Sequence, residues 1–459
     1  MSQITRPATK QLQDELTKRA TELGVPGAAA GVLCADEEQQ AFHGVTSIEN
    51  PLPVDEHTLF QFGSTGKTYT ATAMMRLVEQ GLVDLHQRVK TYVPELRLQD
   101  KDVEENVTVL HLFNHTAGWS GDVLDDTGRG DDALAKYVEL LANVPQETPL
   151  GKAASYNNAA LSLAGRIIEK VTGKTYEQAM KELIFTPLGL DDTFFFLNDV
   201  ITRRFVVGHT TEDGALKVAR PWALPRGGNP AGGMSATVGD LIKWARFHLG
   251  DGKPLLTKES LDRMKQPTFE MRGSALGDFV GIAWFLRDID GVRVVKHGGN
   301  TIGQNCGFQM IPERDFAVVV LTNGGEKASV LEEGLVRWAF ENYAGVVERD
   351  PEPVKRPGAA LAEYAGRFET IAVVCHVSVS DGGLSVKAEV KPEVWAQVSE
   401  GDPPDEPPMP LGFVGEDGDG YVVSDGPSKG MKGYFARNDA GEVDAVHLGG
   451  RLAMKVEGE

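Results

Sequence analysis

The sequence predicts an α+β fold: a domain with a central antiparallel sheet, flanking helices and a helical lobe, followed by a small all-β barrel domain. Strand-like patterns occur close to the N-terminus and again around residue 300, and helical patterns dominate the region between them. After a proline-rich, charged stretch at 349–358, the patterns are those of short strands. We therefore expect a first domain at 1–348, a linker at 349–358 and a barrel domain at 359–459.

Two amphipathic helices and two groups of strands define the first domain. Residues 8–23 place apolar side chains at helical intervals, with Gly24 as a stop, and 327–345 has a second pattern of this kind. The opening helix is followed by the strand-like stretches GAAAGVLC and QQAFHGV, and the closing helix is preceded by VRVVKHGG, CGFQMIPERD and FAVVVLTN. Since strands from both ends surround the helical region, one antiparallel sheet is expected, with the terminal helices packed on it.

The barrel domain is predicted from short β-type runs that alternate with turn clusters such as DGG, EDGDG and NDAGE. The runs are VVCHVSVS, LSVKAEV, EVWAQVS, YVVSD, GYFAR and RLAMKV.

Composition limits the partners and the cofactors. The chain has 66 acidic and 46 basic residues and a net charge of −20, which disfavours nucleic acid or an anionic membrane as a partner. Cys34, Cys306 and Cys375 are far apart and show no metal-binding spacing, so buried free thiols are expected. No metal ligand pattern such as His-Glu-x-x-His occurs, and no metal or other cofactor is predicted.

The first residues, MSQITRPATKQLQDELTKRA, have no apolar core of the kind that a secretory signal needs. No later stretch approaches the roughly 20 uninterrupted apolar residues of a membrane span. The expectation is a cytoplasmic protein.

The stretch FGSTGKTYT places Ser64 three residues before Lys67 at the predicted start of a helix. Residues three apart share a helix face, so Lys67 can reach the Ser64 hydroxyl. Partial burial and the positive end of the helix dipole both favour the neutral form of a lysine, and a neutral lysine can activate a serine nucleophile. The alternative is a serine that caps the helix, followed by a solvated lysine.

Two further places carry chemistry. In SYNNAALSLAG, Tyr156 can relay a proton or be a phenolate, and Asn158 can hydrogen-bond a lysine and a substrate. The alternative is a packed tyrosine with Asn158 as the cap of the next helix.

In VVKHGGNTIGQ, His297 ends a predicted strand, and Gly298 and Gly299 allow a close backbone approach. The backbone N–H of Asn300 could then join that of Ser64 in an oxyanion hole. The alternative here is a simple turn.

These three motifs, in this order, resemble those of the serine β-lactamase and penicillin-binding-protein family, especially its class C and D-aminopeptidase/esterase branch. The stretches NHTAGW, LGLDDTFF, NPAGGMSATVGDL and GFQMIPERDFAVVVLTN are similar to the same family, and the resemblance covers about residues 10–345. It implies a β-lactamase/transpeptidase-like first domain. The C-terminal domain resembles the lipocalin-like modules of some relatives.

The resemblance also implies roles for the site residues. Ser64 would form an acyl-enzyme, and Lys67 and Tyr156 would share the base and acid roles. Asn158 would orient Lys67 and the substrate. His297 would stand at the first position of the third motif. The backbone N–H groups of Ser64 and Asn300 would form the oxyanion hole.

The third motif departs from the pattern of true β-lactamases, because His297 stands where they have a lysine. A histidine is mostly neutral at pH 7, so weak affinity for anionic β-lactams is expected, with a preference for esters, thioesters or amides.

Three functions remain open from the sequence. The first is a hydrolase of small esters or of amides and peptides that contain D-amino acids. The second is a penicillin-binding-protein-type thioesterase or peptide cyclase, which would need a carrier protein as a partner. The third is a non-catalytic penicillin-binding or sensor protein. The sequence also leaves a homo-oligomer open.

Overall fold

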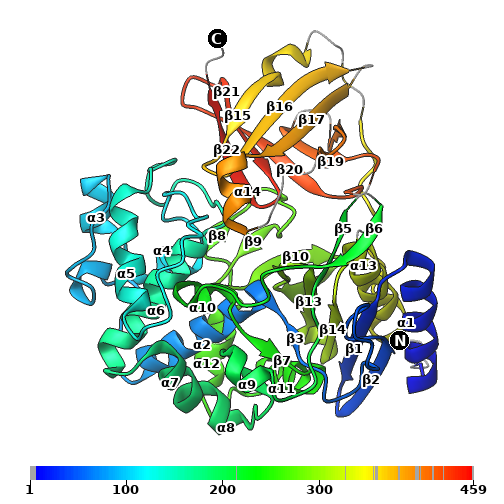
Figure 1. The fold of residues 1–459 in the computed structure, drawn as a ribbon. Helices are drawn as coiled ribbons and strands as arrows, with labels where there is room; N and C mark the ends of the chain where they lie inside the picture. The colour runs from blue at the N-terminus through cyan, green and yellow to red at the C-terminus, as the bar shows by residue number, and fades with distance from the viewer. Residues whose placement is uncertain are drawn as a thin grey trace.

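The computed structural model describes residues 7–212, 214–325, 327–354, 356, 360–380, 383–398, 403, 405–415, 418–426 and 428–456. These residues form a sheet with helices on both faces, a helical lobe beside it and a barrel above both (Figure 1). The predicted fold class is confirmed.

The large sheet joins strands from the two ends of the first domain. Its order is β2-β1-β14-β13-β11-β10-β9-β8, with β12 paired to β13, and every pair is antiparallel. The strands are β1 Gly27–Cys34, β2 Glu37–Gly44, β8 Phe269–Glu270, β9 Phe279–Val280, β10 Phe285–Ile289, β11 Val292–Lys296, β12 Gly299–Thr301, β13 Gln304–Ile311 and β14 Phe316–Thr322.

Both faces of this sheet are covered, as the strand β14 shows. Phe316, Val318 and Val320 pack with α1 (Thr9–Leu23) and α13 (Ala328–Ala339) on one face. Val319 and Leu321 belong to the core on the other face, where α11 (Val238–Leu249) lies. Successive side chains of a strand point to opposite faces, so a strand buried on both sides is continuously apolar. The two predicted terminal helices are confirmed.

The helical lobe and its small strands lie between β2 and β8 in sequence. Its helices are α2 Gly66–Glu79, α3 Lys101–Asn106, α4 Val109–Phe113, α5 Ala133–Leu140, α6 Asn158–Thr172, α7 Tyr176–Met180, α8 Thr186–Leu188, α9 Leu197–Val200, α10 Asn229–Gly232 and α12 Lys258–Met264, and a 3₁₀ turn, η1 Gly63–Thr65, precedes α2. Two small sheets contain β3 Phe60–Gln61, β4 Thr193–Phe194, β7 Ser235–Ala236, β5 His209–Glu212 and β6 Ala215–Val218.

The C-terminal domain is a closed eight-stranded barrel in which strands adjacent in sequence are neighbours and β15 pairs with β22. Phe368, Phe413, Tyr421 and Phe435 are buried in its interior, so side chains fill the barrel. The strands are β15 Gly366–Glu369, β16 Val373–Ser380, β17 Gly383–Val390, β18 Met409–Phe413, β19 Gly420–Val423, β20 Lys432–Arg437, β21 Val443–Leu448 and β22 Arg451–Val456.

One predicted strand of this domain is wrong. Residues 393–398 of the run EVWAQVS lie in a helix, α14 Pro392–Val398. Pro392 stands at the first position of that helix, where a missing N–H and a preset φ are favourable, and the N–H groups of Val394 and Trp395 donate to the carbonyl of Lys391. This local geometry outweighs the strand preference of valine and tryptophan.

The division at 349–358 stays a prediction, and residues 355, 357 and 358 lie outside the described part of the chain. Within the described part, the N–H of Val354 donates to the carbonyl of Phe413 (2.8 Å), and Asp350 pairs with Arg337 (2.6 Å). The segment therefore contacts both the barrel and α13.

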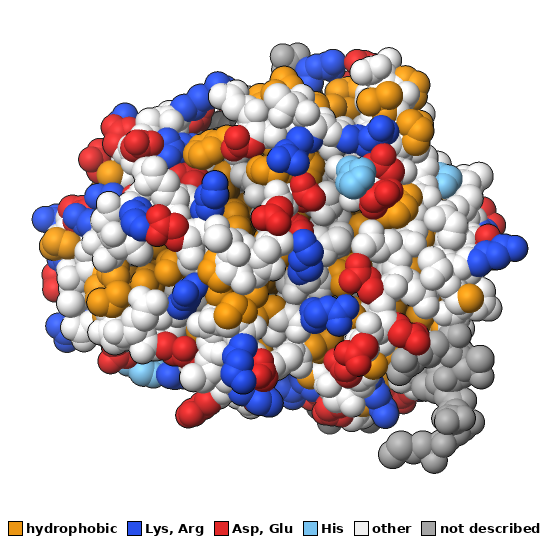
Figure 2. All heavy atoms as spheres, turned by 90° about the horizontal axis from the view of Figure 1, so that it is seen from below, with side chains coloured by type: hydrophobic (Ala, Val, Ile, Leu, Met, Phe, Trp, Pro, Cys, Tyr) orange, Lys and Arg blue, Asp and Glu red, His pale blue; other side chains and the backbone are white. Residues whose placement is uncertain are grey.

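One face of the molecule carries side chains of both charges. On the face turned away from the barrel, acidic and basic side chains are interspersed with apolar ones (Figure 2). No helix within the described residues combines the length and the apolar character needed to cross a bilayer. Cys34, Cys306 and Cys375 are buried thiols that form no disulfide with one another, as expected.

The barrel docks on the first domain through the turn between β21 and β22. Gly450 in this turn has φ +89°, and a Cβ added there would lie 2.6 Å from Leu276 of the first domain. The neighbouring Gly449 has φ +56°, and the described residues leave space around its added Cβ. Position 450 therefore favours glycine because of its positive φ and because of the close contact with Leu276, whereas position 449 favours glycine because of its positive φ alone.

We expect Gly450→Ala to lower the free energy of unfolding by about 1–3 kcal/mol, because it adds an overlap to an unfavourable backbone conformation. Gly449→Ala is the matched control, with the backbone cost alone. Thermal unfolding of the two variants measures the difference, and equal midpoints would contradict the proposed close contact.

Candidate active site

Ser64 lies in the 3₁₀ turn η1, which is held between the lobe and the large sheet. The Thr65 hydroxyl donates to the carbonyl of His297 (2.9 Å). Gly63 has φ +50°, and a Cβ added there would lie 2.6 Å from the backbone nitrogen of Asn300. Ser64, the predicted nucleophile, therefore lies against the end of β11 and the start of β12. It precedes α2 in the sequence by two residues.

Lys67 lies in the first turn of α2 and its side chain is fully buried. Its Nζ donates to the Oγ of Ser64 (3.0 Å) and to the carbonyl of Ala231 in α10 (2.6 Å). Burial lowers the pKa of Lys67 well below its usual value, the positive charge of Arg451 lowers it further, and the carboxylate of Asp122 opposes both. The amine is thus suited to accept a proton from Ser64.

Tyr156 lies just before α6 and contacts the same serine. Its hydroxyl lies close enough to Ser64 for that side chain to act on its pKa, and the Lys67 Nζ lies 4.8 Å from its ring centroid. Burial raises the pKa of Tyr156 well above its usual value, which disfavours the phenolate. Of the two predicted forms, the protonated phenol is therefore favoured and the phenolate is not. A protonated phenol can relay a proton.

The start of α6 distinguishes the roles of two adjacent asparagines. The Asn157 side chain caps the helix by accepting from the N–H of Ala160 (2.8 Å), so the cap is Asn157 and not Asn158. The Nδ2 of Asn158 donates to Asp122 (2.9 Å), while Lys67 bonds Ser64 and the backbone of α10. A role of Asn158 in orienting Lys67 stays a prediction.

His297 follows β11 and is buried. Its Nδ1 donates to the carbonyl of Gly298 (2.7 Å), and its Nε2 finds no hydrogen-bond partner among the described residues. Burial, together with the nearby Lys67, lowers the pKa of His297 to about 3. The imidazole is therefore neutral at pH 7 and brings no positive charge to the third motif.

The glycines after His297 allow β12 to approach the nucleophile. A Cβ added at Gly299 would lie 1.9 Å from the carbonyl oxygen of Phe62 and 2.9 Å from the backbone nitrogen of Ser64. At Gly298 the nearest atom would be 3.4 Å away, an ordinary contact. Gly299 is thus the glycine that this approach requires, and the oxyanion hole at Ser64 and Asn300 stays a prediction.

Two charged residues that the sequence did not single out lie beside the tyrosine. Arg451, from the barrel, forms a bidentate ion pair with Asp122 through its Nε (2.6 Å) and Nη2 (2.8 Å). The guanidinium carbon lies 5.0 Å from the ring centroid of Tyr156. The loop that carries Asp122 packs closely on the start of α6. A Cβ added at Gly121 in this loop would lie 2.5 Å from the carbonyl oxygen of Tyr156.

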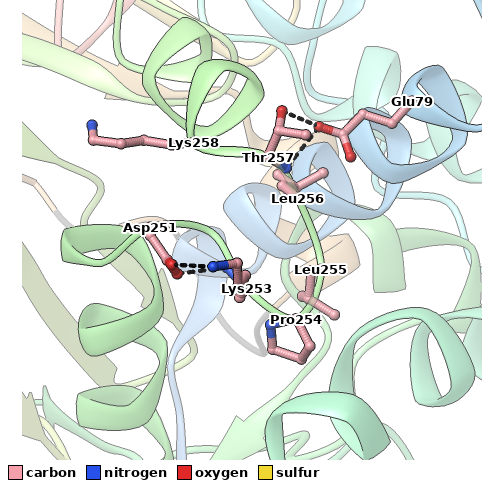
Figure 3. Close-up of a pocket in the computed structure, with 8 residues that line it drawn as sticks. All are labelled: Glu79, Asp251, Lys253, Pro254, Leu255, Leu256, Thr257 and Lys258. Atoms are coloured by element: carbon pink, nitrogen blue, oxygen red, sulfur yellow. Dashed lines mark hydrogen bonds and ion pairs between the residues drawn. The ribbon is translucent and has the colours of Figure 1, made fainter.

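A surface pocket elsewhere does not offer comparable chemistry. It lies between α2 and the loop before α12 (Figure 3), where Glu79 accepts from the N–H and hydroxyl of Thr257 and Lys253 pairs with Asp251. These polar side chains already have partners, and none of them is a serine or cysteine nucleophile. The site around Ser64 is therefore the candidate active site.

Comparison with known proteins agrees with this geometry. Residues 11–343 match the family model described as Beta-lactamase. The chain belongs to the beta-lactamase family. It is 33% identical over 370 residues to Penicillin-binding protein 4 of Amycolatopsis lactamdurans, which covers 78% of this chain and 96% of that protein. The resemblance inferred from the three motifs is confirmed.

Two solved structures show the same fold as this member of the beta-lactamase family. The crystal structure of SurE with D-Leu has a TM-score of 0.75 and 22% identity and covers 98% of this chain and 99% of that one. The D-amino acid amidase of Ochrobactrum anthropi SV3, complexed with D-phenylalanine, has a TM-score of 0.61 and 22% identity, over 72% of this chain and 99% of that one. The match to SurE extends over nearly the whole chain, and so includes the barrel.

We expect Tyr156→Phe to slow acylation of Ser64 by about 10²–10⁴-fold, because it removes the hydroxyl beside the predicted nucleophile while keeping the buried ring. Intact-protein mass spectrometry after timed exposure to a fluorophosphonate or an activated ester measures the rate. Tyr343→Phe is a matched control, since its hydroxyl bonds Gln39, near the N-terminal helix. Equal losses in the two variants would show that the Tyr156 hydroxyl has no special role.

Proposed function

We propose that this protein is a serine hydrolase that forms an acyl-enzyme on Ser64 and cleaves esters, or amides and peptides that contain D-amino acids, with at most weak β-lactamase activity. The observation that carries this proposal is the 3.0 Å hydrogen bond between the fully buried Lys67 amine and the Ser64 hydroxyl. A buried amine with a lowered pKa beside a serine is the arrangement that nucleophilic acyl transfer needs.

The proposed steps combine the contacts of Ser64, Lys67 and Tyr156 with the predicted oxyanion hole. The Oγ of Ser64 attacks the substrate carbonyl carbon while its proton passes to the Lys67 amine. The bond from that carbon to the leaving group then breaks as the Tyr156 phenol gives the leaving group a proton, and the Lys67 ammonium returns a proton to the phenol. The backbone N–H groups of Ser64 and Asn300 hold the carbonyl oxygen as it gains negative charge. Water then attacks the ester on Ser64, and the acid product leaves with the serine proton restored.

The charge balance of the site supports neutral substrates. Lys67 and His297 are favoured in their neutral forms, and the two full charges that act on Lys67, those of Arg451 and Asp122, cancel in a bidentate pair. A site without a net positive charge has little attraction for the carboxylate of a penicillin. An ester or amide carbonyl needs no such charge.

Support for D-amino acids comes from the two structural neighbours, one a D-amino acid amidase and the other solved with D-Leu. A thioesterase or cyclase that takes a peptide from a carrier protein, and a penicillin-binding sensor, use the same acylation step and differ in the fate of the acyl-enzyme. A cytoplasmic location and a homo-oligomer stay predictions.

We expect turnover of p-nitrophenyl esters or D-amino-acid amides to exceed that of nitrocefin and penicillin by orders of magnitude in kcat/KM, because the third motif carries no cation. Steady-state kinetics over these substrates, L-amino-acid amides and peptidyl thioesters measures the preference. Ser64→Ala is the control and should abolish turnover.

Other outcomes would change the assignment. A lasting penicillin adduct on Ser64 without turnover of any substrate would indicate a sensor. Turnover confined to peptidyl thioesters would indicate a thioesterase or cyclase. Penicillin hydrolysis that outpaces ester hydrolysis would contradict the neutral-substrate argument.

A further inference from the structure

The barrel contacts the active site directly through its β21–β22 turn. The carbonyl of Gly450 accepts a hydrogen bond from the backbone N–H of Tyr156 (2.9 Å), and the N–H of Leu452 donates to the hydroxyl of Ser155 (3.2 Å). These two bonds bracket Arg451, whose guanidinium lies over the Tyr156 ring. The turn thus holds the backbone of the proton-relaying tyrosine and places a cation beside its ring.

Arg451 and Lys67 share this ring, at 5.0 Å and 4.8 Å from its centroid. Two positive charges so close to one another repel, and because an arginine keeps its proton, the repulsion favours loss of the proton from the lysine. Asp122 opposes this effect on the lysine, but it also accepts two hydrogen bonds from Arg451, which neutralises much of its charge.

The other titratable groups that face Lys67 carry no charge at pH 7. Burial lowers the pKa of His115 and of His297, and it raises the pKa of Tyr156. The charge on the lysine therefore depends on its burial and on the Arg451–Asp122 pair. About a third of the Arg451 side chain and 14% of that of Asp122 are exposed, so the pair is partly accessible to solvent while Lys67 is buried.

We propose that the β21–β22 turn is part of the acylation machinery and that Arg451 acts in it as a positioning residue for the Lys67–Tyr156 pair. This inference rests on the serine hydrolase function proposed above. With Arg451 present, the Asp122 carboxylate is paired with the guanidinium, and Lys67 stays in its neutral, basic form. Without Arg451, Asp122 loses its ion pair and keeps only the hydrogen bond from Asn158, so its charge stabilises the ammonium form of Lys67, which cannot accept the Ser64 proton.

The pH dependence of acylation tests this, with the neutral ester p-nitrophenyl acetate and the full-length chain. Lys67 must be deprotonated to react, so the acid limb of the rate profile follows its pKa. R451M should move this limb to higher pH by about one unit or more, and D122N should move it to lower pH. The double variant should fall between them.

Two further variants control for structural effects. R451K keeps the positive charge in the turn and should restore much of the limb position even if the loss of the guanidinium loosens the docking. R367M removes a barrel arginine from an exposed ion pair with Glu369 and should leave the limb in place. A purely structural role of Arg451 would lower the rate at every pH without moving the limb.

The proposal is overturned if R451M and D122N leave the limb where it is or move it in the same direction while Ser64 still reacts. A wild-type chain whose Ser64 takes neither the ester nor a fluorophosphonate would instead overturn the proposed function itself. The two failures are therefore distinguishable by the wild-type mass spectrum alone.

Discussion

The burial of the Lys67 amine beside Ser64 is the constraint on which the other features of the site depend. An ammonium ion without a counter-charge is costly in a protein interior, whereas a neutral amine needs only hydrogen-bond partners. Lys67 has two, the Ser64 hydroxyl and the carbonyl of Ala231. Its place in α2, a helix buried over most of its length, therefore both supports the fold and selects the form of the lysine that activates a serine.

Distant parts of the chain must meet for this amine to be useful. The large sheet brings β11 and β12 against the Ser64 turn, α10 supplies the second acceptor of Lys67, and the start of α6 supplies Tyr156. Gly232 shows how tightly these parts approach, because a Cβ added there would lie 3.0 Å from the backbone nitrogen of Ser64. The four segments that form the site are joined by one apolar core, which the lobe and the sheet share.

Much of this arrangement is predictable from the sequence. The strands around GAAAGVLC and FAVVVLTN and the helices at both ends of the first domain follow from apolar periodicity, and Ser64, Lys67, Tyr156 and His297 follow from motif spacing. Local geometry is harder to predict: Asn157 and not Asn158 caps α6, and most of the run EVWAQVS folds as a helix behind Pro392. The deciding factor is the hydrogen bond from the Ala160 N–H to the Asn157 side chain in the first case and a proline in the second, and apolar periodicity predicts neither.

The contact between Arg451 and Asp122 has no comparable signal in the sequence. The two residues are 329 positions apart, each belongs to an ordinary local sequence, and only the docking of the barrel brings them together. Their pairing also explains why a histidine suits position 297. Asp122 is the carboxylate whose charge raises the pKa of Lys67, and it is already paired with Arg451. A lysine in the buried place of His297 would be a cation without a counter-charge, so a neutral imidazole on the strand and an arginine on the barrel are mutually consistent.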